Sequence, residues 1–233
     1  MSLDSCCDAN DLYLARGQSV NICRPFLTGD VFDGVAIPGA QEDGRAIVIA
    51  HPCSMRGRNG ALQEKILCAA VKPYVGDSRP EAWENGYYSV MPLPHLLEDG
   101  QCFGGLFNEI GLVTSANLDS ANRIACLSVP GINILQQRLI YHLTRLEVRT
   151  FTLHDACCHT FEEADLLEEW NDSLTAGGIS LAESTAEFEE LVRRDQGGGR
   201  TLQGDLQDAQ RRASVRATVR AEARTTLASM GRT

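Results

Sequence analysis

The pattern of apolar and polar positions divides the chain at about residue 130. Before this point, short β-branched and apolar runs alternate with glycine, proline and aspartate, which is typical of strands joined by turns. The runs that predict strands are 30–37, 46–50, 66–71, 87–91 and 123–128. Residues 103–113 fit either a strand or a helix. Because no helical pattern separates most of these runs, we expect an antiparallel barrel rather than alternating βαβ units.

After Pro130-Gly131 the period changes to three and four residues. Ile132, Leu135, Leu139, Leu143 and Leu146 follow this spacing, which predicts an amphipathic helix. Further helices are predicted from a cap at Thr160 to about Trp170, over 184–195, and over 202–229 after a glycine break at 197–199. The predicted fold class is therefore α+β, a small antiparallel barrel followed by C-terminal helices.

These patterns suggest four regions. We expect a loose N-terminal arm at 1–24, a β-barrel at 25–130, a helical segment packing on the barrel at 131–196, and a basic C-terminal helix at 197–233. No apolar run approaches the roughly 20 residues that a membrane span needs. The N-terminus does not have the pattern of a secretory signal. We therefore expect a cytoplasmic protein with no membrane partner.

Charge is unevenly distributed along the chain. Residues 193–233 contain nine arginines and four acidic residues, so they carry +5, and the formal total of −10 leaves −15 for residues 1–192. An acidic body is a poor general surface for nucleic acid. Any nucleic-acid binding is therefore expected in a loop or in the tail.

The C-terminal helix presents arginines at a spacing of four, which places them on one ridge. The ridge consists of Arg212, Arg216, Arg220 and Arg224. It could hold nucleic acid through salt-dependent phosphate contacts. The other interpretation is that it lies on an acidic surface of its own or of another subunit, such as that around Glu162, Glu163, Glu168 and Glu169. The apolar face beside the ridge is weak, so we expect the helix to need a partner to stay ordered.

The chain contains nine cysteines, an odd number in a chain of 233 residues. Cys23, Cys68 and Cys126 lie in apolar segments and are expected to be buried, and a disulfide framework is not expected in the cytoplasm. A cluster of possible zinc ligands comprises His154, Cys157, Cys158 and His159, with Cys6-Cys7 as a conceivable completion. The alternative is a polar loop between helices. We predict no metal.

Three short motifs in the first half occur in a recognisable order. They are Gly29-Asp30-Val31, then Gly44-Arg45 leading into the apolar run 46–49, then Cys68-Ala-Ala-Val71. Over about residues 27–75 the chain thereby resembles the MazF/PemK family of toxin endoribonucleases. That resemblance implies an SH3-like barrel, metal-independent RNA cleavage by the 2′-hydroxyl without a cofactor, a bacterial toxin–antitoxin role and a homodimer. The family's arginine matches Arg45, but its small hydroxyl residue is replaced by Lys72.

The candidate catalytic residues are Arg45, His51 and Lys72. Arg45 can fork onto phosphate oxygens, and His51 titrates near neutral pH. Lys72 could serve as a base only if burial lowered its pKa by several units. The alternative is that Arg45 and Lys72 are solvated at strand ends and that His51 caps a turn before Pro52. A nucleophilic role for Cys53 competes with a structural one.

Arg56, Arg58 and Asn59, between two glycines, are the candidate nucleic-acid-binding residues, with an exposed hairpin tip as the alternative. Two functions stay open. The first is an RNA-binding or RNA-cleaving barrel protein. The second is a non-enzymatic scaffold of a bacterial defence or mobile-element complex that binds a protein partner through Arg212, Arg216, Arg220 and Arg224.

Overall fold

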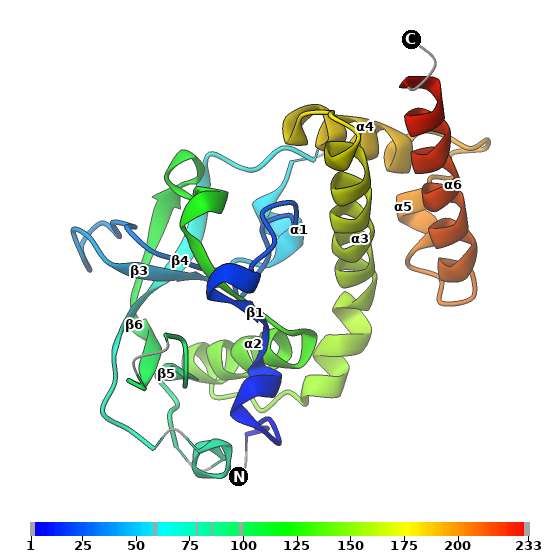
Figure 1. Cartoon of the computed structure of the whole chain (residues 1–233). Coiled ribbons are helices and arrows are strands. Elements are labelled where there is room, and N and C mark those ends of the chain that lie inside the picture. The colour runs from blue at the N-terminus through cyan, green and yellow to red at the C-terminus, as the bar shows by residue number, and fades with distance from the viewer. Residues whose placement is uncertain (1–2, 58–59, 78, 85, 98–99, 231–233) are drawn as a thin grey trace. The chain divides into compact units, whose positions relative to one another are not determined.

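The computed structural model describes residues 3–230 except 58–59, 78, 85 and 98–99. The chain divides into two compact units (Figure 1). Residues 1–22 and 26–156 form the first, which we call the sheet unit. Residues 23–25 and 157–233 form the second, the helical unit. The boundary falls inside the segment 131–196 that the sequence suggested as one region.

The sheet unit contains a curled antiparallel sheet in the order β1-β7-β2-β3-β4-β6-β5. The strands are β1 (Tyr13–Arg16), β2 (Val31–Phe32), β3 (Arg45–Val48), β4 (Lys65–Pro73), β5 (Val90–Leu93), β6 (Phe103–Thr114) and β7 (Arg123–Leu127). The ambiguous segment 103–113 is thus a strand. Together with the C-terminal helices this confirms the α+β class and the antiparallel sheet.

The central residues of β3 and β4 are buried on both faces of the sheet. Ala46 and Val48 face the same side as Cys68 and Ala70, and all four are inaccessible to solvent. They join a core around Phe32, Met55 and Ile66. Because neither face is left to water, these strands show continuous apolar runs rather than polar alternation. That continuity is why they could be predicted.

The two edge strands of the sheet, β1 and β5, approach each other at a seam. The Tyr13 hydroxyl donates a buried hydrogen bond of 2.9 Å to the carbonyl of Pro94, just after β5. Arg16 donates to the carbonyl of His95 and, at 2.9 Å, to Asn10 Oδ1. The curl of the sheet therefore brings its first and fifth strands together through side chains.

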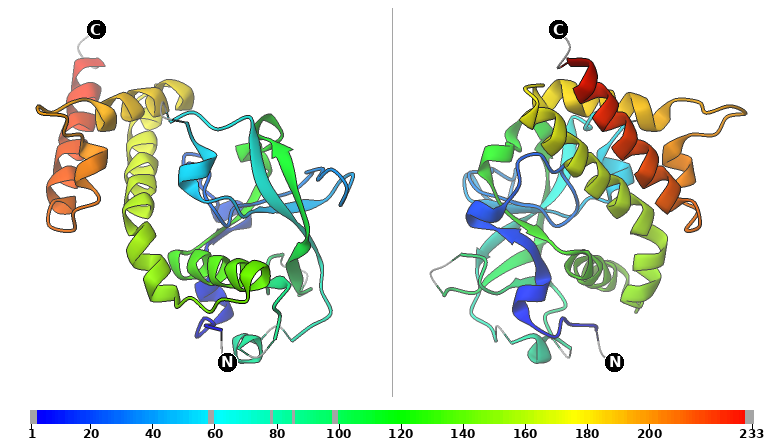
Figure 2. Two further views of the ribbon diagram at one scale, coloured as in Figure 1. Left: turned by 180° about the vertical axis from the view of Figure 1, so that it is seen from behind. Right: turned by 45° about the vertical axis from the view of Figure 1, so that its right-hand side comes forward.

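Short helices and one long helix complete the sheet unit. The 3₁₀ turns are η1 (Ala9–Leu12), η2 (Gly17–Ser19), η3 (Pro80–Trp83), η4 (Ser115–Asn117) and η5 (Ser120–Asn122). The α-helices are α1 (Pro52–Met55) and α2 (Val129–Thr144), and Figure 2 shows α2 alongside one end of the strands. Ser128 caps α2. A Cβ at Gly131 would lie 2.2 Å from the Leu12 carbonyl oxygen, so only glycine fits there.

Helix α3 (Thr150–Ala176) begins in the sheet unit and continues in the helical unit, followed by α4 (Leu181–Arg193), α5 (Leu202–Asp205) and α6 (Arg212–Met230). Within the helical unit, α3, α4 and α6 surround a core that contains Trp170 and Phe188. The centres of these two rings lie 6.0 Å apart, within the distance of about 4.5–7 Å that is usual for aromatic pairs. Val215, Val219 and Ala223 of α6 are buried in this core. The apolar face of α6 therefore packs inside its own unit.

Several predicted boundaries were wrong. The N-terminal arm is not loose: Leu3 and Leu12 are buried, and β1 pairs with β7. Thr160 is not a cap, since α3 begins ten residues earlier at Thr150. The long helix over 202–229 is interrupted between α5 and α6. In the described part of the chain, no helix is long and apolar enough to cross a membrane.

Candidate functional site

Arg45 is the first residue of β3, where the sequence placed it. Its Nε lies 3.2 Å from Asp33 Oδ1, and its guanidinium carbon lies 5.2 Å from the centre of the Phe103 ring. The side chain is 29% exposed and that of Asp33 is 53% exposed. Arg45 is therefore held at the rim of the sheet by a carboxylate and an aromatic face.

Lys72 lies on the neighbouring strand but on the opposite face of the sheet. Arg45 pairs with Val71 in the β3–β4 register, so Arg45 and Val71 share a face and the next residue points away. Lys72 Nζ lies 2.5 Å from Glu109 Oε2, and both side chains are partly exposed. Lys72 is thus a solvated ion-pair partner, without the burial that a lysine base would need.

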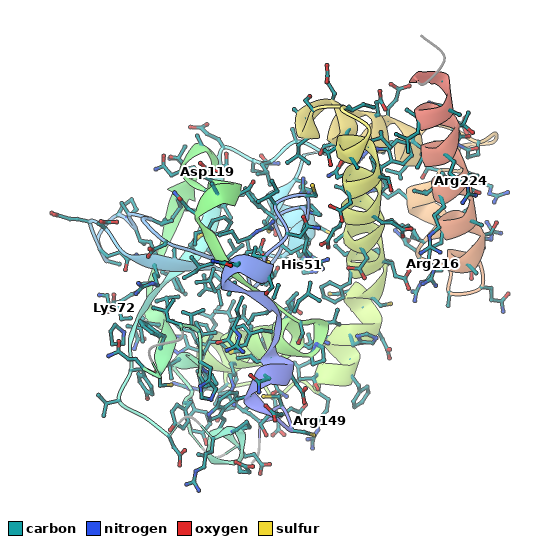
Figure 3. The ribbon with its side chains drawn as sticks, viewed as in Figure 1. His51, Lys72, Asp119, Arg149, Arg216 and Arg224 are labelled. Carbon is teal, nitrogen blue, oxygen red and sulfur yellow. The ribbon has the colours of Figure 1, made fainter. Side chains whose placement is uncertain are left out.

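His51 lies beyond the other end of β3. It is six positions further along the chain than Arg45, and at about 3.3 Å per strand residue this corresponds to roughly 20 Å. Its Nδ1 accepts a hydrogen bond of 3.2 Å from the backbone N–H of Cys53, so the ring caps α1. Figure 3 shows Lys72 and His51 separated across the sheet unit. The capping interpretation of His51 is confirmed.

The three candidate catalytic residues do not lie together on one face or at one end of the sheet. Arg45 and His51 stand at opposite ends of β3, and Arg45 and Lys72 project from opposite faces. A phosphate on Arg45 could not be reached by all three side chains together. A joint active site of Arg45, His51 and Lys72 therefore does not follow from this fold.

The loop with the candidate nucleic-acid-binding residues is only partly described. Arg56 donates to the carbonyl of Gly60 at 3.0 Å and to that of Phe26 at 3.4 Å, and it bridges to Leu62. Arg58 and Asn59 lie outside the described residues. The guanidinium of Arg56 therefore ties the base of this loop to the backbone.

The arginine ridge lies on an acidic surface of its own unit. Arg216 Nη1 lies 3.3 Å from Glu162 Oε2, and Arg220 forks onto Glu169 with distances of 2.7 and 2.9 Å. Arg212 donates to the Leu206 carbonyl at 2.9 Å and contacts Cys158 Sγ. The intramolecular interpretation of the ridge is confirmed for Arg216 and Arg220.

The histidine and cysteine cluster is helical, so the prediction of a polar loop was wrong. All of its residues lie within α3, and Cys157 is buried. Among the residues that the structure describes, no group of three metal-ligating side chains is gathered closely enough for an ion. Cys53, the other cysteine considered, is exposed at the start of α1.

A groove lies at the seam, and the sequence did not reveal it. Its volume is about 1060 Å³. It is lined by β1 and η2, by residues His95, Leu96, Leu97 and Gly100 after β5, and by Asn10 and Ile124. Leu14 on β1 is 52% exposed there. The only sequence signal was the short run Tyr13–Arg16 inside a polar arm.

The chain matches no protein-family model. It also has no match among the curated proteins.

Proposed function

We propose that this chain is a non-enzymatic binding protein, with an SH3-like barrel as scaffold and the seam groove as the binding site. The observation that supports it is the groove itself, which is lined by all four residues of edge strand β1. Edge strands offer backbone groups to a further strand. The partner we propose is an extended segment of another protein that adds to β1 and fills the gap toward the segment after β5.

The size and lining of the groove agree with a polypeptide ligand. Small-molecule sites have volumes of about 300–1,000 Å³ and enclose their ligands, whereas this groove of about 1060 Å³ lies at the upper limit of that range and is open to solvent. Leu14, Leu97 and Ile124 offer apolar contacts, and Gln18 and Ser19 offer polar ones. Such mixed lining suits alternating side chains of an extended segment.

The tail is a weaker candidate for partner binding than the seam. Val215, Val219 and Ala223 already pack in the helical core, and Arg216 and Arg220 already have carboxylate partners. A partner on α6 would have to displace these contacts. At the seam, by contrast, Leu14 is 52% exposed in the groove and has no core position to give up.

Selection of peptides displayed on phage against the whole chain tests the proposal. We expect enriched extended peptides whose affinity falls about tenfold or more for Leu14→Lys, since the change places a charge at the edge of β1. Leu112→Lys is the matched control, because Leu112 is 53% exposed on β6 and does not line the groove. Failure to enrich any peptide, or equal binding to both variants, would overturn the proposal.

RNA cleavage is the second candidate function. It is supported by Arg45, which lies at the start of β3 on the rim of the sheet. Arg45 belongs to one of the motifs that carry the resemblance to the MazF/PemK family. Incubation of a long RNA with the protein in EDTA distinguishes the two functions. Metal-independent cleavage that disappears in Arg45→Ala would favour the ribonuclease, whereas intact RNA favours the binding protein.

A further inference from the structure

The helical unit contains a small pocket of about 140 Å³ between α3 and α6. Its apolar lining comes from Leu166, Trp170, Val219, Ala223 and Leu227. Its polar lining comes from Glu169, Ser173, Arg220 and Arg224. A cavity of about 150 Å³ with apolar walls is large enough to hold a benzene ring. The pocket therefore has room for a ring-sized or short branched group.

The charge pattern along the two helices leaves one cation at the pocket. Arg216 pairs with Glu162 and Arg220 with Glu169, so successive arginines of α6 meet acids on α3. Arg224, one turn further along α6, instead shares the pocket with Ser173. Among the residues that the structure describes, no acidic side chain pairs with Arg224, which projects from α6 in Figure 3.

We propose that this pocket binds a small aromatic or branched aliphatic carboxylate. The ligand's apolar body lies on Trp170 and Leu166, and its carboxylate accepts hydrogen bonds from Arg224. Arginine forks match a carboxylate in geometry as well as in charge.

The charge of the lining selects among ligands of the same size. The bidentate ion pair between Arg220 and Glu169 has no net charge, so Arg224 makes the net charge of the pocket lining positive. A neutral analogue keeps only the apolar contacts, and an amine meets a like charge. A preference for the carboxylate over neutral and cationic ligands of the same size would therefore distinguish this site from one that only buries an apolar ring.

Titration of the full chain with benzoate, followed by two-dimensional NMR, tests the proposal. For so small a ligand we expect a Kd on the order of 1 mM, with shifts in the signals of Trp170 and Leu227. Benzyl alcohol and benzylamine serve as neutral and cationic probes of the same size. We expect Arg224→Gln to weaken benzoate about tenfold and to leave benzyl alcohol unchanged.

Arg194→Gln is the matched control, because Arg194 is exposed, loses the same charge and does not line the pocket. It should bind benzoate as the unaltered chain does. Ser173→Phe, which fills the pocket mouth, should abolish binding of both benzoate and benzyl alcohol. Equal binding of benzoate and benzyl alcohol, equal weakening by both arginine substitutions, or no shift at Trp170 and Leu227 would overturn the proposal.

Discussion

Arginines in the sheet unit and in the helical unit are used in different ways. In the sheet unit, Arg123 and Arg138 are almost wholly buried and donate to backbone carbonyls, and Arg123 also pairs with Asp30. In the helical unit, Arg216 and Arg220 are about half exposed and pair with carboxylates of the neighbouring helix. Arg24 of that unit is also shielded, but its partner Asp165 is 65% exposed.

The difference follows from how each unit is built. A curled sheet with short strands joins segments that are far apart in sequence, and their backbone groups need partners inside the unit. Arg138 supplies hydrogen-bond partners for the backbone carbonyls of the segment around η3. It donates to the carbonyl of Trp83 at 3.0 Å and to those of Gly86 and Tyr87 at 3.4 Å. Burial lowers the pKa of Arg138 to about 10. Helices satisfy their own backbone, so their charges can stay on the surface.

The largest effect is expected from Asp30→Asn in the sheet unit. Asp30 Oδ2 lies 2.9 Å from Arg123 Nη1 and accepts from the backbone N–H of Leu27, and the two charged side chains are 2% and 0% exposed. Removing one charge leaves the other buried without its counter-charge, which costs about 3–5 kcal/mol. Urea denaturation measures the loss, with Trp83 as the probe of the sheet unit in a Trp170→Phe background.

Asp77→Asn is the control for this experiment, because it also removes a carboxylate from an ion pair of the sheet unit. Its partner Arg79 is 78% exposed, so solvent already screens the pair. The free energy of unfolding should change far less than for Asp30→Asn. Similar losses in the free energy of unfolding for the two variants would show that burial of an ion pair does not determine how much it stabilises this unit.

The sequence predicted the interior of the sheet well and its edges poorly. The runs that became β3 and β4 are continuous and apolar because both faces are covered. Strand β1 was missed because its four residues include Leu14 and Arg16, which point to the groove and the seam rather than into a core. Its position depends on pairing with β7, more than a hundred residues later, which no local pattern encodes.

The candidate site shows the same limit of local patterns. The sequence placed Arg45 at the start of a strand, and the structure confirms this. It could not show that Val71, rather than Lys72, shares the face of Arg45, because a shift of one residue in register reverses the face. Nor could it show that Asp33 and Glu109 accompany these cations.

A smaller effect, dependent on pH, is expected from Asp4→Asn in the sheet unit. Burial raises the pKa of Asp4, but hydrogen bonds from Thr150 and Gln137 and the charge of Arg149 outweigh it, so the pKa lies below the usual 3.8. Asp4 Oδ2 accepts from the backbone N–H of Thr150 at 3.1 Å, as a helix cap does for α3. Losing a cap costs about 1 kcal/mol, less where solvent screens it.

Because the pKa of Asp4 is lower in the folded chain, its contribution is present at neutral pH and is lost as the pH falls through the folded-state pKa. Urea midpoints measured between neutral pH and about pH 3 should therefore converge for Asp4→Asn and the unaltered chain. Thr150→Val, which removes one donor at 2.7 Å, should show a smaller difference of the same sign. A difference that grows on acidification would contradict this account.

The smallest effect is expected from the exposed pair Arg220–Glu169 in the helical unit. A double-mutant cycle with Arg220→Ala and Glu169→Ala isolates the coupling between the two side chains from their separate contacts with the core. Urea denaturation followed by Trp170 fluorescence in a Trp83→Phe background reports on this unit, since Trp170 is buried beside Phe188. Because both side chains are about half exposed, the coupling should be weak and should disappear in 1 M salt, where the screening length falls to about 3 Å.

The coupling obtained from the same cycle on Arg123 and Asp30 should be large and almost independent of salt. If the coupling between Arg220 and Glu169 persisted in high salt, the helical unit would be using its charges as the sheet unit does, and the contrast between the two units would fail.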